Sequence, residues 1–179
     1  MNISKRKQPW LRFCILAAAG LTVSCIGGPS SHPEKVVVSC SRSVLSQPYN
    51  SVAVVPFETV SSSFPVSGQK LADSFSALLP DLGYTVKPLA ISEDKTGNRT
   101  VHLKPGLVRK ILADARSGEI DAVVFGSLEA AEGVTTYTVV MKSTVSAENI
   151  WTVYGENVSL QRMVDELKKR MFPHKKSGR

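Results

Sequence analysis

The sequence predicts an α/β fold: a single domain with a mixed, five-stranded sheet and packed helices, in the order β-α-β-α-β-β-β-α. Two observations support this prediction. Residues 51–58 and 120–127 are short apolar runs rich in valine and alanine, which is typical of strands covered on both faces. Two segments with helical spacing lie between the runs, so the two strands are predicted to be parallel.

The composition fits one globular domain. The chain has 179 residues, of which 42% are hydrophobic and 21% are charged. Its net charge is +7, but the first twelve positions hold four basic residues and no acid, and subtracting these four leaves +3. This balance predicts no nucleic-acid partner.

The first residues have the pattern of a targeting segment. A basic stretch at residues 5–7 precedes an apolar run at residues 13–23. The run is shorter than the ~20 apolar residues that a membrane-spanning helix needs. A basic flank, a short apolar core and small residues at its end are typical of a secretory signal peptide, which we assign to residues 1–24.

Residues 21–25, Leu-Thr-Val-Ser-Cys, resemble the lipobox of bacterial lipoproteins, in which a small residue precedes a lipid-modified cysteine. Thr22 is a departure, since the family prefers leucine there. The resemblance implies that Cys25 carries a diacylglycerol and an amide-linked acyl chain, and more than one chain is needed for firm anchoring. The alternative is a secreted protein cut nearby.

Residues 25–47 are rich in serine, proline and glycine and are predicted to form a flexible tether between lipid and domain. Residues 36–38, three valines, are a candidate short edge strand within it. Cys40 also follows a lipobox-like stretch, but His32, Glu34 and Lys35 interrupt any apolar core before it. With Cys25 acylated, Cys40 would be unpaired, so no disulfide framework is expected.

The folded domain is predicted to span residues 48–172. After the first strand, Ser67 is a plausible N-cap for a helix that Pro80 should end or kink, and Gly83 permits a turn into a second strand at residues 84–87. The apolar stripe of this helix is Leu71, Phe75, Leu78, Leu79 and Leu82.

Residues 89–104 form a long polar connection, either a functional loop or, as the simpler interpretation, an exposed variable one. Pro105 suits the start of a second helix and Gly118 its end. The apolar stripe of the second helix is Leu107, Val108, Ile111, Leu112 and Ala115.

Three strands and a helix complete the domain. Residues 120–128 form the third strand, residues 135–145 alternate as a half-buried antiparallel strand, and residues 150–154 form the fifth. Right-handed crossovers predict the sheet order 2-1-3-4-5, with the fifth strand at an edge. A helical stripe from Leu160 to Met171 follows, and residues 173–179 form a basic tail.

Three sequence motifs, together with the predicted order of strands and helices, resemble a group of bacterial envelope domains that includes CsgG, LpoB and the amino-terminal domain of TolB. They are Val-Ala-Val-Val-Pro-Phe at residues 52–57, Leu-Ala-Asp at 71–73 and Asp-Ala-Val-Val-Phe-Gly at 121–126. A hairpin leading to Trp151 is similar too, and the resemblance covers residues 51–171. It implies a small accessory protein of the cell envelope, at the outer membrane and facing the periplasm.

Ser67 and Lys70 fit the Ser-x-x-Lys motif of penicillin-binding enzymes, and residues 95–97 fit Lys-Thr-Gly. The two motifs lie too close together for a serine acylase, and the middle Ser-x-Asn motif is absent from the sequence. A helix cap and a turn explain both, so we expect no enzyme activity and no cofactor.

The three histidines, His32, His102 and His174, lie far apart, and no cluster has the spacing of metal ligands. Trp151 and Tyr154 fall on the predicted edge strand, where aromatic side chains could bind a partner, with core packing as the alternative.

The sequence therefore predicts a lipid-anchored, non-enzymatic accessory factor that binds an envelope protein, such as a cell-wall synthase or a secretion component. The alternative is an oligomeric subunit of an envelope transport or secretion assembly. A homo-oligomer is compatible with either prediction.

Overall fold

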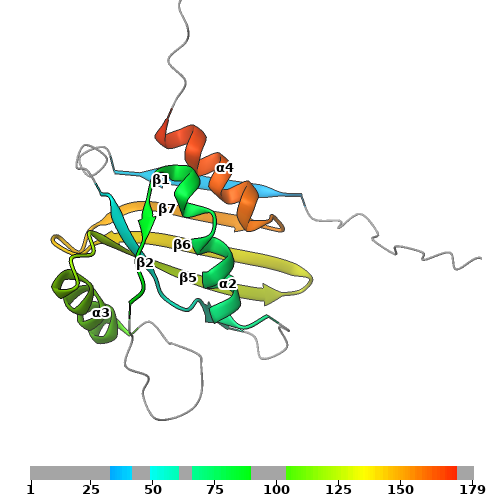
Figure 1. Ribbon diagram of the computed structural model, residues 1–179. Coiled ribbons are helices and arrows are strands. Elements are labelled where there is room, and N and C mark those ends of the chain that lie inside the picture. Colours follow the sequence, from blue (N-terminus) through cyan, green and yellow to red (C-terminus); the bar gives the residue numbers. More distant parts are fainter. Residues whose placement is uncertain (1–32, 42–48, 61–65, 90–103, 173–179) are drawn as a thin grey trace, which may run out of the picture. The chain divides into compact units, whose positions relative to one another are not determined.

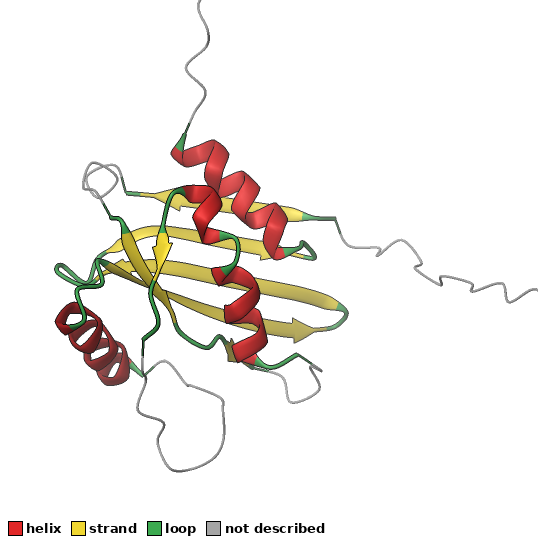
Figure 2. Ribbon diagram, viewed as in Figure 1, coloured by secondary structure: helices red, strands yellow, loops and turns green. Residues whose placement is uncertain are grey.

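The computed structural model describes residues 33–41, 49–60, 66–89 and 104–172, and it arranges them as one mixed sheet with helices on its faces (Figures 1 and 2). The sheet order is β1-β7-β6-β5-β2-β4, and the short strand β3 pairs with β5. The strands are β1 (Lys35–Cys40), β2 (Ser51–Val54), β3 (Glu58–Thr59), β4 (Thr85–Val86), β5 (Ala122–Ala131), β6 (Val134–Ser143) and β7 (Asn149–Glu156). The helices are α2 (Gly68–Ser76), the 3₁₀ helix η1 (Leu79–Leu82), α3 (Pro105–Ser117) and α4 (Leu160–Met171).

The predicted α/β class and the order of the five predicted strands are confirmed. Those strands are β2, β4, β5, β6 and β7, and β2 pairs in parallel with both β4 and β5. Right-handed crossovers through α2 and α3 account for this arrangement, because they place β4 and β5 on opposite sides of β2. The sheet has seven strands rather than five, since β1 and β3 also pair.

The prediction that the fifth strand lies at a sheet edge is wrong. The whole of β1 pairs antiparallel with β7, from Lys35 opposite Glu156 to Cys40 opposite Trp151. The candidate strand at residues 36–38 is therefore confirmed and longer than expected. Residues 35–40, which the sequence analysis placed in the tether, belong to the sheet. The other predicted edge, now β4, stays at the end of the sheet.

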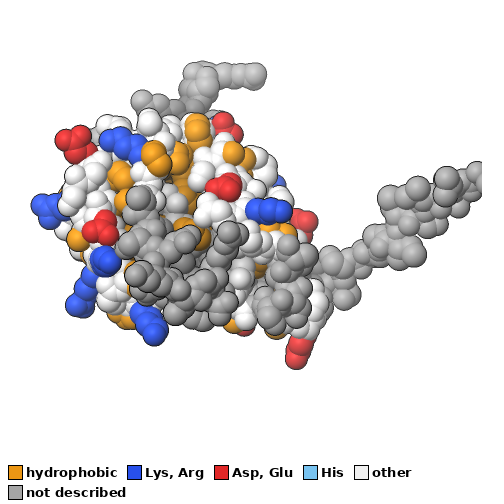
Figure 3. Space-filling model, turned by 60° about the horizontal axis from the view of Figure 1, so that its bottom comes forward, with side chains coloured by type: hydrophobic (Ala, Val, Ile, Leu, Met, Phe, Trp, Pro, Cys, Tyr) orange, Lys and Arg blue, Asp and Glu red, His pale blue; other side chains and the backbone are white. Residues whose placement is uncertain are grey.

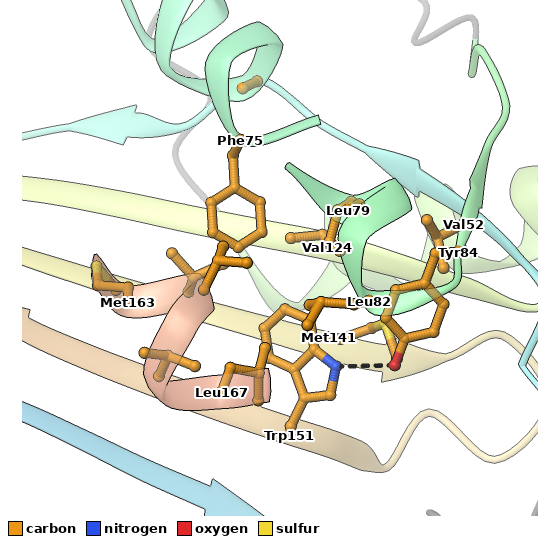
Figure 4. Packing of buried hydrophobic residues seen from close by; sticks show 14 of the residues in the cluster. Val52, Phe75, Leu79, Leu82, Tyr84, Val124, Met141, Trp151, Met163 and Leu167 are labelled. Atoms are coloured by element: carbon orange, nitrogen blue, oxygen red, sulfur yellow. Dashed lines mark hydrogen bonds between the residues drawn. The ribbon is translucent and has the colours of Figure 1, made fainter. Parts of the chain in front are cut away.

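One face of the sheet is covered by α2, η1 and α4 (Figures 1 and 2). Ser67 caps α2 as predicted, since its Oγ accepts a hydrogen bond from the backbone N–H of Lys70 at 3.3 Å. The largest core cluster lies beneath these helices, and Figure 4 shows Phe75, Leu79, Met163 and Leu167 converging on Trp151. These side chains therefore tie three helical segments to strand β7.

The opposite face is covered only in part. Helix α3 packs Ile111, Leu112 and Ala115 against residues of β2 and β5, such as Ala53 and Val123. Gly118 follows the helix as predicted, but the left-handed residue that ends it is Glu119, with φ 55°. Helix α3 therefore covers the β2–β5 part of this face.

Phe57 and Gly126, which lie in two of the recognised motifs, pack together with Gly68 of α2. The Phe57 backbone N–H donates to the Gly68 carbonyl at 3.0 Å, and a Cβ on Gly68 would lie 1.8 Å from the Phe57 carbonyl oxygen. The Phe57 ring lies over Gly126 of β5, where a Cβ would come within 2.5 Å of it. Only glycine allows this close approach. Phe57 and the two glycines therefore determine how the segment after β2 packs against α2 and β5.

Asp121 joins the beginnings of β2 and β5. Its Oδ2 accepts hydrogen bonds from the Asn50 backbone N–H at 2.9 Å, the Ser51 backbone N–H at 2.8 Å and the Ser51 hydroxyl at 3.0 Å. Ser51 is only 8% exposed, so its backbone N–H depends on this carboxylate, whereas its hydroxyl also reaches the Glu119 carbonyl oxygen at 3.1 Å. Asp121, the first residue of the Asp-Ala-Val-Val motif, thus has a structural role, because it joins two strands.

Candidate partner-binding surface

Strands β6, β7, β1 and the second half of β5 present side chains on the face where α3 packs, beyond the part that α3 covers. The register fixes which residues share this face, because the partly buried valines of β1 and the buried side chains of β7 point to the opposite, helix-covered face. We call this surface the open sheet face. It comprises Lys35, Val37, Ser39, Ser127, Glu129, Thr136, Thr138, Val140, Thr152, Tyr154 and Glu156.

Tyr154 lies at the middle of the open sheet face, directly between Val37 of β1 and Thr138 of β6. Its hydroxyl donates a hydrogen bond to Glu156, and this bond raises the pKa of the Tyr154 hydroxyl. The Lys35 Nζ lies 5.9 Å from the centre of the Tyr154 ring, which is within cation–π range. The hydrogen bond to Glu156 and the Lys35 cation near the ring thus hold the Tyr154 side chain in place.

The rest of the open sheet face combines one exposed valine with a row of hydroxyls. Val37 is 49% exposed, which is unusual for a valine in a strand. Thr136, Thr138 and Thr152 are half-buried, as expected of side chains on a pleated surface that none of the described helices covers. A flat surface of this kind offers an aromatic ring, methyl groups and hydrogen-bonding groups to a partner.

Trp151, the other predicted contact residue, points to the helix-covered face. It is 1% exposed, its ring centre lies 6.4 Å from that of Phe75, and its Nε1 donates to the Tyr84 hydroxyl at 3.4 Å (Figure 4). The alternative interpretation, core packing, describes its position, and in this fold its side chain has no exposed surface to offer to a partner. Tyr154 remains the predicted contact residue.

The sequence analysis missed Val37 and Lys35, since it placed both in the tether. The only signal that could have placed them in the sheet was the run of three valines after Lys35, which suits a strand. Alternation along β1 then puts Lys35, Val37 and Ser39 on the open sheet face.

The residues that the structure describes do not form the serine acylase site or the metal site that the sequence analysis considered. Ser67 and Lys70 lie at the start of α2, where the serine is the cap, and residues 95–97 lie outside the described residues. No group of three His, Cys, Asp or Glu residues that could hold a metal ion occurs in the described part of the chain. In the same residues, no helix has the length and apolar character to cross a membrane.

Cys40 lies half-buried on β1 with a free thiol, and burial raises the pKa of that thiol, while the nearby Arg170 lowers it. A raised pKa makes the thiol less reactive, in keeping with a packing role. Cys25, the residues before it, most of the connection at 89–104 and the basic tail lie outside the described residues.

No protein-family model matches the chain, and no curated protein matches its sequence. Solved structures match its fold. The PelC dodecamer from Paraburkholderia phytofirmans is 16% identical with a TM-score of 0.50, over 78% of this chain and 96% of that one. Lipoprotein GNA1162 from Neisseria meningitidis is 17% identical with a TM-score of 0.47, over 73% of this chain and 100% of that one.

The carboxyl-terminal domain of LpoB from Salmonella enterica is 16% identical with a TM-score of 0.44, over 62% of this chain and 84% of that one. LpoB belongs to the group named from the sequence words. At these identities the likeness concerns the fold alone. This chain shares the fold of PelC, and the solved structures to which it is similar include LpoB, a protein of the group that the sequence resembles.

Proposed function

We propose that this chain is a lipid-anchored accessory protein of the bacterial envelope, which works by binding another envelope protein rather than by catalysis. We place it at the outer membrane, facing the periplasm. The observation that carries the binding role is the open sheet face, where the half-exposed Val37 lies directly beside the aromatic ring of Tyr154. An uncovered face with an aromatic centre is typical of an interaction surface.

The anchor rests on the sequence before the domain. The basic flank, the apolar run and the Ser-Cys junction at residues 24–25 support acylation of Cys25. The test is metabolic labelling with palmitate in cells that express the parent chain or Cys25→Ala. We expect label in the parent and none in the variant, and label that survives in Cys25→Ala would contradict the anchor.

The partner is proposed to be an envelope protein such as a cell-wall synthase or a secretion component. The binding test is crosslinking in intact membranes followed by capture of the tagged chain. Val37→Glu and Tyr154→Ala should each reduce recovery of the crosslinked partner at least tenfold, because such contacts dominate interface energies.

Val145→Glu is the matched control for this experiment. Val145 is 72% exposed and lies in the turn between β6 and β7, away from the open sheet face. Val145→Glu introduces the same charge as Val37→Glu at a position outside the open sheet face. If Val37→Glu and Val145→Glu recover the partner equally while both remain folded by circular dichroism, the open sheet face is not the binding surface.

A second candidate function is an oligomeric subunit of a transport or secretion assembly. It is favoured by the fold shared with PelC, whose solved form is a dodecamer. The described chain also ends its sheet at β1, an edge strand that a neighbouring copy could contact. Light scattering of the purified chain tests this candidate: a defined oligomer supports it, and a monomer at micromolar concentration contradicts it.

A further inference from the structure

We infer that the last turn of α4 docks on the surface of an anionic phospholipid bilayer. This inference rests on the proposed membrane location and adds an orientation to it: the domain would lie with this end against the lipid. The contact residues are Lys168, Lys169, Arg170 and Phe172, which we call the basic end of α4.

The three cations are exposed and consecutive, so they spread over about 200° of the last turn, on the side that does not face the core. Helix dipoles favour cations at this position, which explains one or two of them. The acids nearest along the helix, Asp165 and Glu166, lie one turn earlier. Glu166 is paired with Arg162 at 3.4 Å and with Lys169 at 2.8 Å, so Arg162 offsets its charge, while Lys169 divides its charge between this pair and an anionic surface.

Phe172 supplies an independent observation. It directly follows the cations and is 54% exposed, whereas the other described phenylalanines, Phe57, Phe75 and Phe125, are buried. The helix dipole gives no reason for an exposed aromatic side chain at this point. Cations next to an exposed aromatic residue match the interface of a bilayer, where headgroups carry the negative charge and the ring enters the acyl boundary.

The rest of α4 defines how it can bind. Its apolar side chains Met163, Val164 and Leu167 are buried in the core, so the helix cannot lie with that face in a membrane. Only its end is available, and Figure 1 shows that end beside β1, away from α3. The sequence continues the same character, since residues 168–179 contain six Lys or Arg and no acid.

Charge elsewhere on the domain is mixed. Figure 3 turns the opposite end of the domain toward the reader and shows basic and acidic side chains scattered among one another. Helix α3 also exposes cations, but Asp114 lies among them and no large exposed aromatic residue accompanies them. The basic end of α4 is therefore the surface whose charge and apolar character together fit an anionic bilayer.

The test uses the chain from residue 25 with Cys25→Ser, so that no lipid is attached. It is sedimented with vesicles of phosphatidylcholine alone or with 30 mol% phosphatidylglycerol, which isolates this contact from the anchor. We expect binding only to anionic vesicles and its loss in ~0.5 M salt, because screening removes surface attraction. Each basic residue should contribute about fivefold, so Lys168→Gln, Lys169→Gln and Arg170→Gln together should weaken binding about 100-fold.

The matched control carries the same loss of charge on α3, in Lys104→Gln, Arg109→Gln and Arg116→Gln, and should bind as the parent does. Phe172→Ser should weaken binding several-fold without a change of charge. Equal weakening by the α3 and α4 triple variants, or binding to neutral vesicles, would overturn the inference. So would unchanged binding by Phe172→Ser, since that would indicate a general affinity for polyanions. Palmitate labelling tests the anchor separately, so the two proposals can fail independently.

Discussion

Replacing Asp121 by alanine should destabilise the domain without removing any core side chain. The carboxylate accepts three hydrogen bonds, two from backbone N–H groups and one from the Ser51 hydroxyl, at 2.8–3.0 Å. These bonds hold the start of β2 against the start of β5 across seventy positions of sequence. Asp121→Ala leaves the Ser51 backbone N–H without its acceptor, and at 8% exposure water replaces the carboxylate poorly. The Ser51 hydroxyl keeps the Glu119 carbonyl oxygen as an acceptor at 3.1 Å.

The magnitude follows from these contacts. A hydrogen bond to a charged group contributes about 1.5–3 kcal/mol, and an unsatisfied buried donor costs about 1–3 kcal/mol. Asn50 is exposed and can turn to water, so Ser51 carries most of the effect. We expect a loss of about 2–3 kcal/mol in the free energy of unfolding, which for a domain of this size lowers Tm by about 6–10 °C.

The same site predicts a pH dependence. Burial acts to raise the pKa of Asp121, but the hydrogen bonds from Ser51 and Asn50 outweigh it and the pKa lies below its ordinary value. A lowered pKa in the folded state stabilises the fold above the unfolded pKa of about 3.9, and this stabilisation is lost as the pH falls through the folded value. The stability difference between the parent and Asp121→Asn should therefore shrink below about pH 4.

The assay is urea unfolding, followed by the fluorescence of the buried Trp151, between pH 3 and 7. Asp114→Ala is the control, since Asp114 is an exposed acid on α3, and it should change stability by less than about 0.5 kcal/mol. An Asp121→Ala domain as stable as the Asp114→Ala domain at pH 7 would refute the reasoning, as would a parent–Asp121→Asn difference that does not change with pH.

Three further predictions concern single residues. Gly126→Ala places a Cβ 2.5 Å from the Phe57 ring and should lower stability by about 1–3 kcal/mol in thermal melts; an unchanged Tm would show that the ring moves freely. Glu119→Gly should raise stability by about 1 kcal/mol, because Glu119 has φ 55° and glycine adopts this conformation without strain; a lower urea midpoint would contradict this. Ser67→Ala should cost about 1 kcal/mol by loss of the helix cap and leave partner capture intact, whereas labelling of Ser67 by a β-lactam probe would indicate an acylase.

The strand order could be predicted because it depends on local patterns and one general rule. Apolar runs marked β2 and β5, helical stripes marked α2 and α3, and right-handed crossovers fixed how these elements join. The same local patterns marked Ser67 as a cap, and the structure shows that it is one.

The pairing of β1 could not be predicted in this way. Lys35 lies opposite Glu156, so nearly the whole domain separates the partners, and no local pattern records such a contact. For this reason the sequence predicted only part of the open sheet face. Tyr154 was named from its strand, but Trp151, three positions before it, points to the core, and Val37 entered the surface only through β1.

The pairing of β1 with β7 also has a consequence for biogenesis. The ribosome makes the valines of β1 first and their partner strand last, so the sheet cannot close until almost the entire domain has been synthesised. A chain with this topology cannot complete its sheet while it is being made. During that interval the Val-Val-Val segment is an unpaired strand exposed to aggregation, and it is the segment that a chaperone would need to cover.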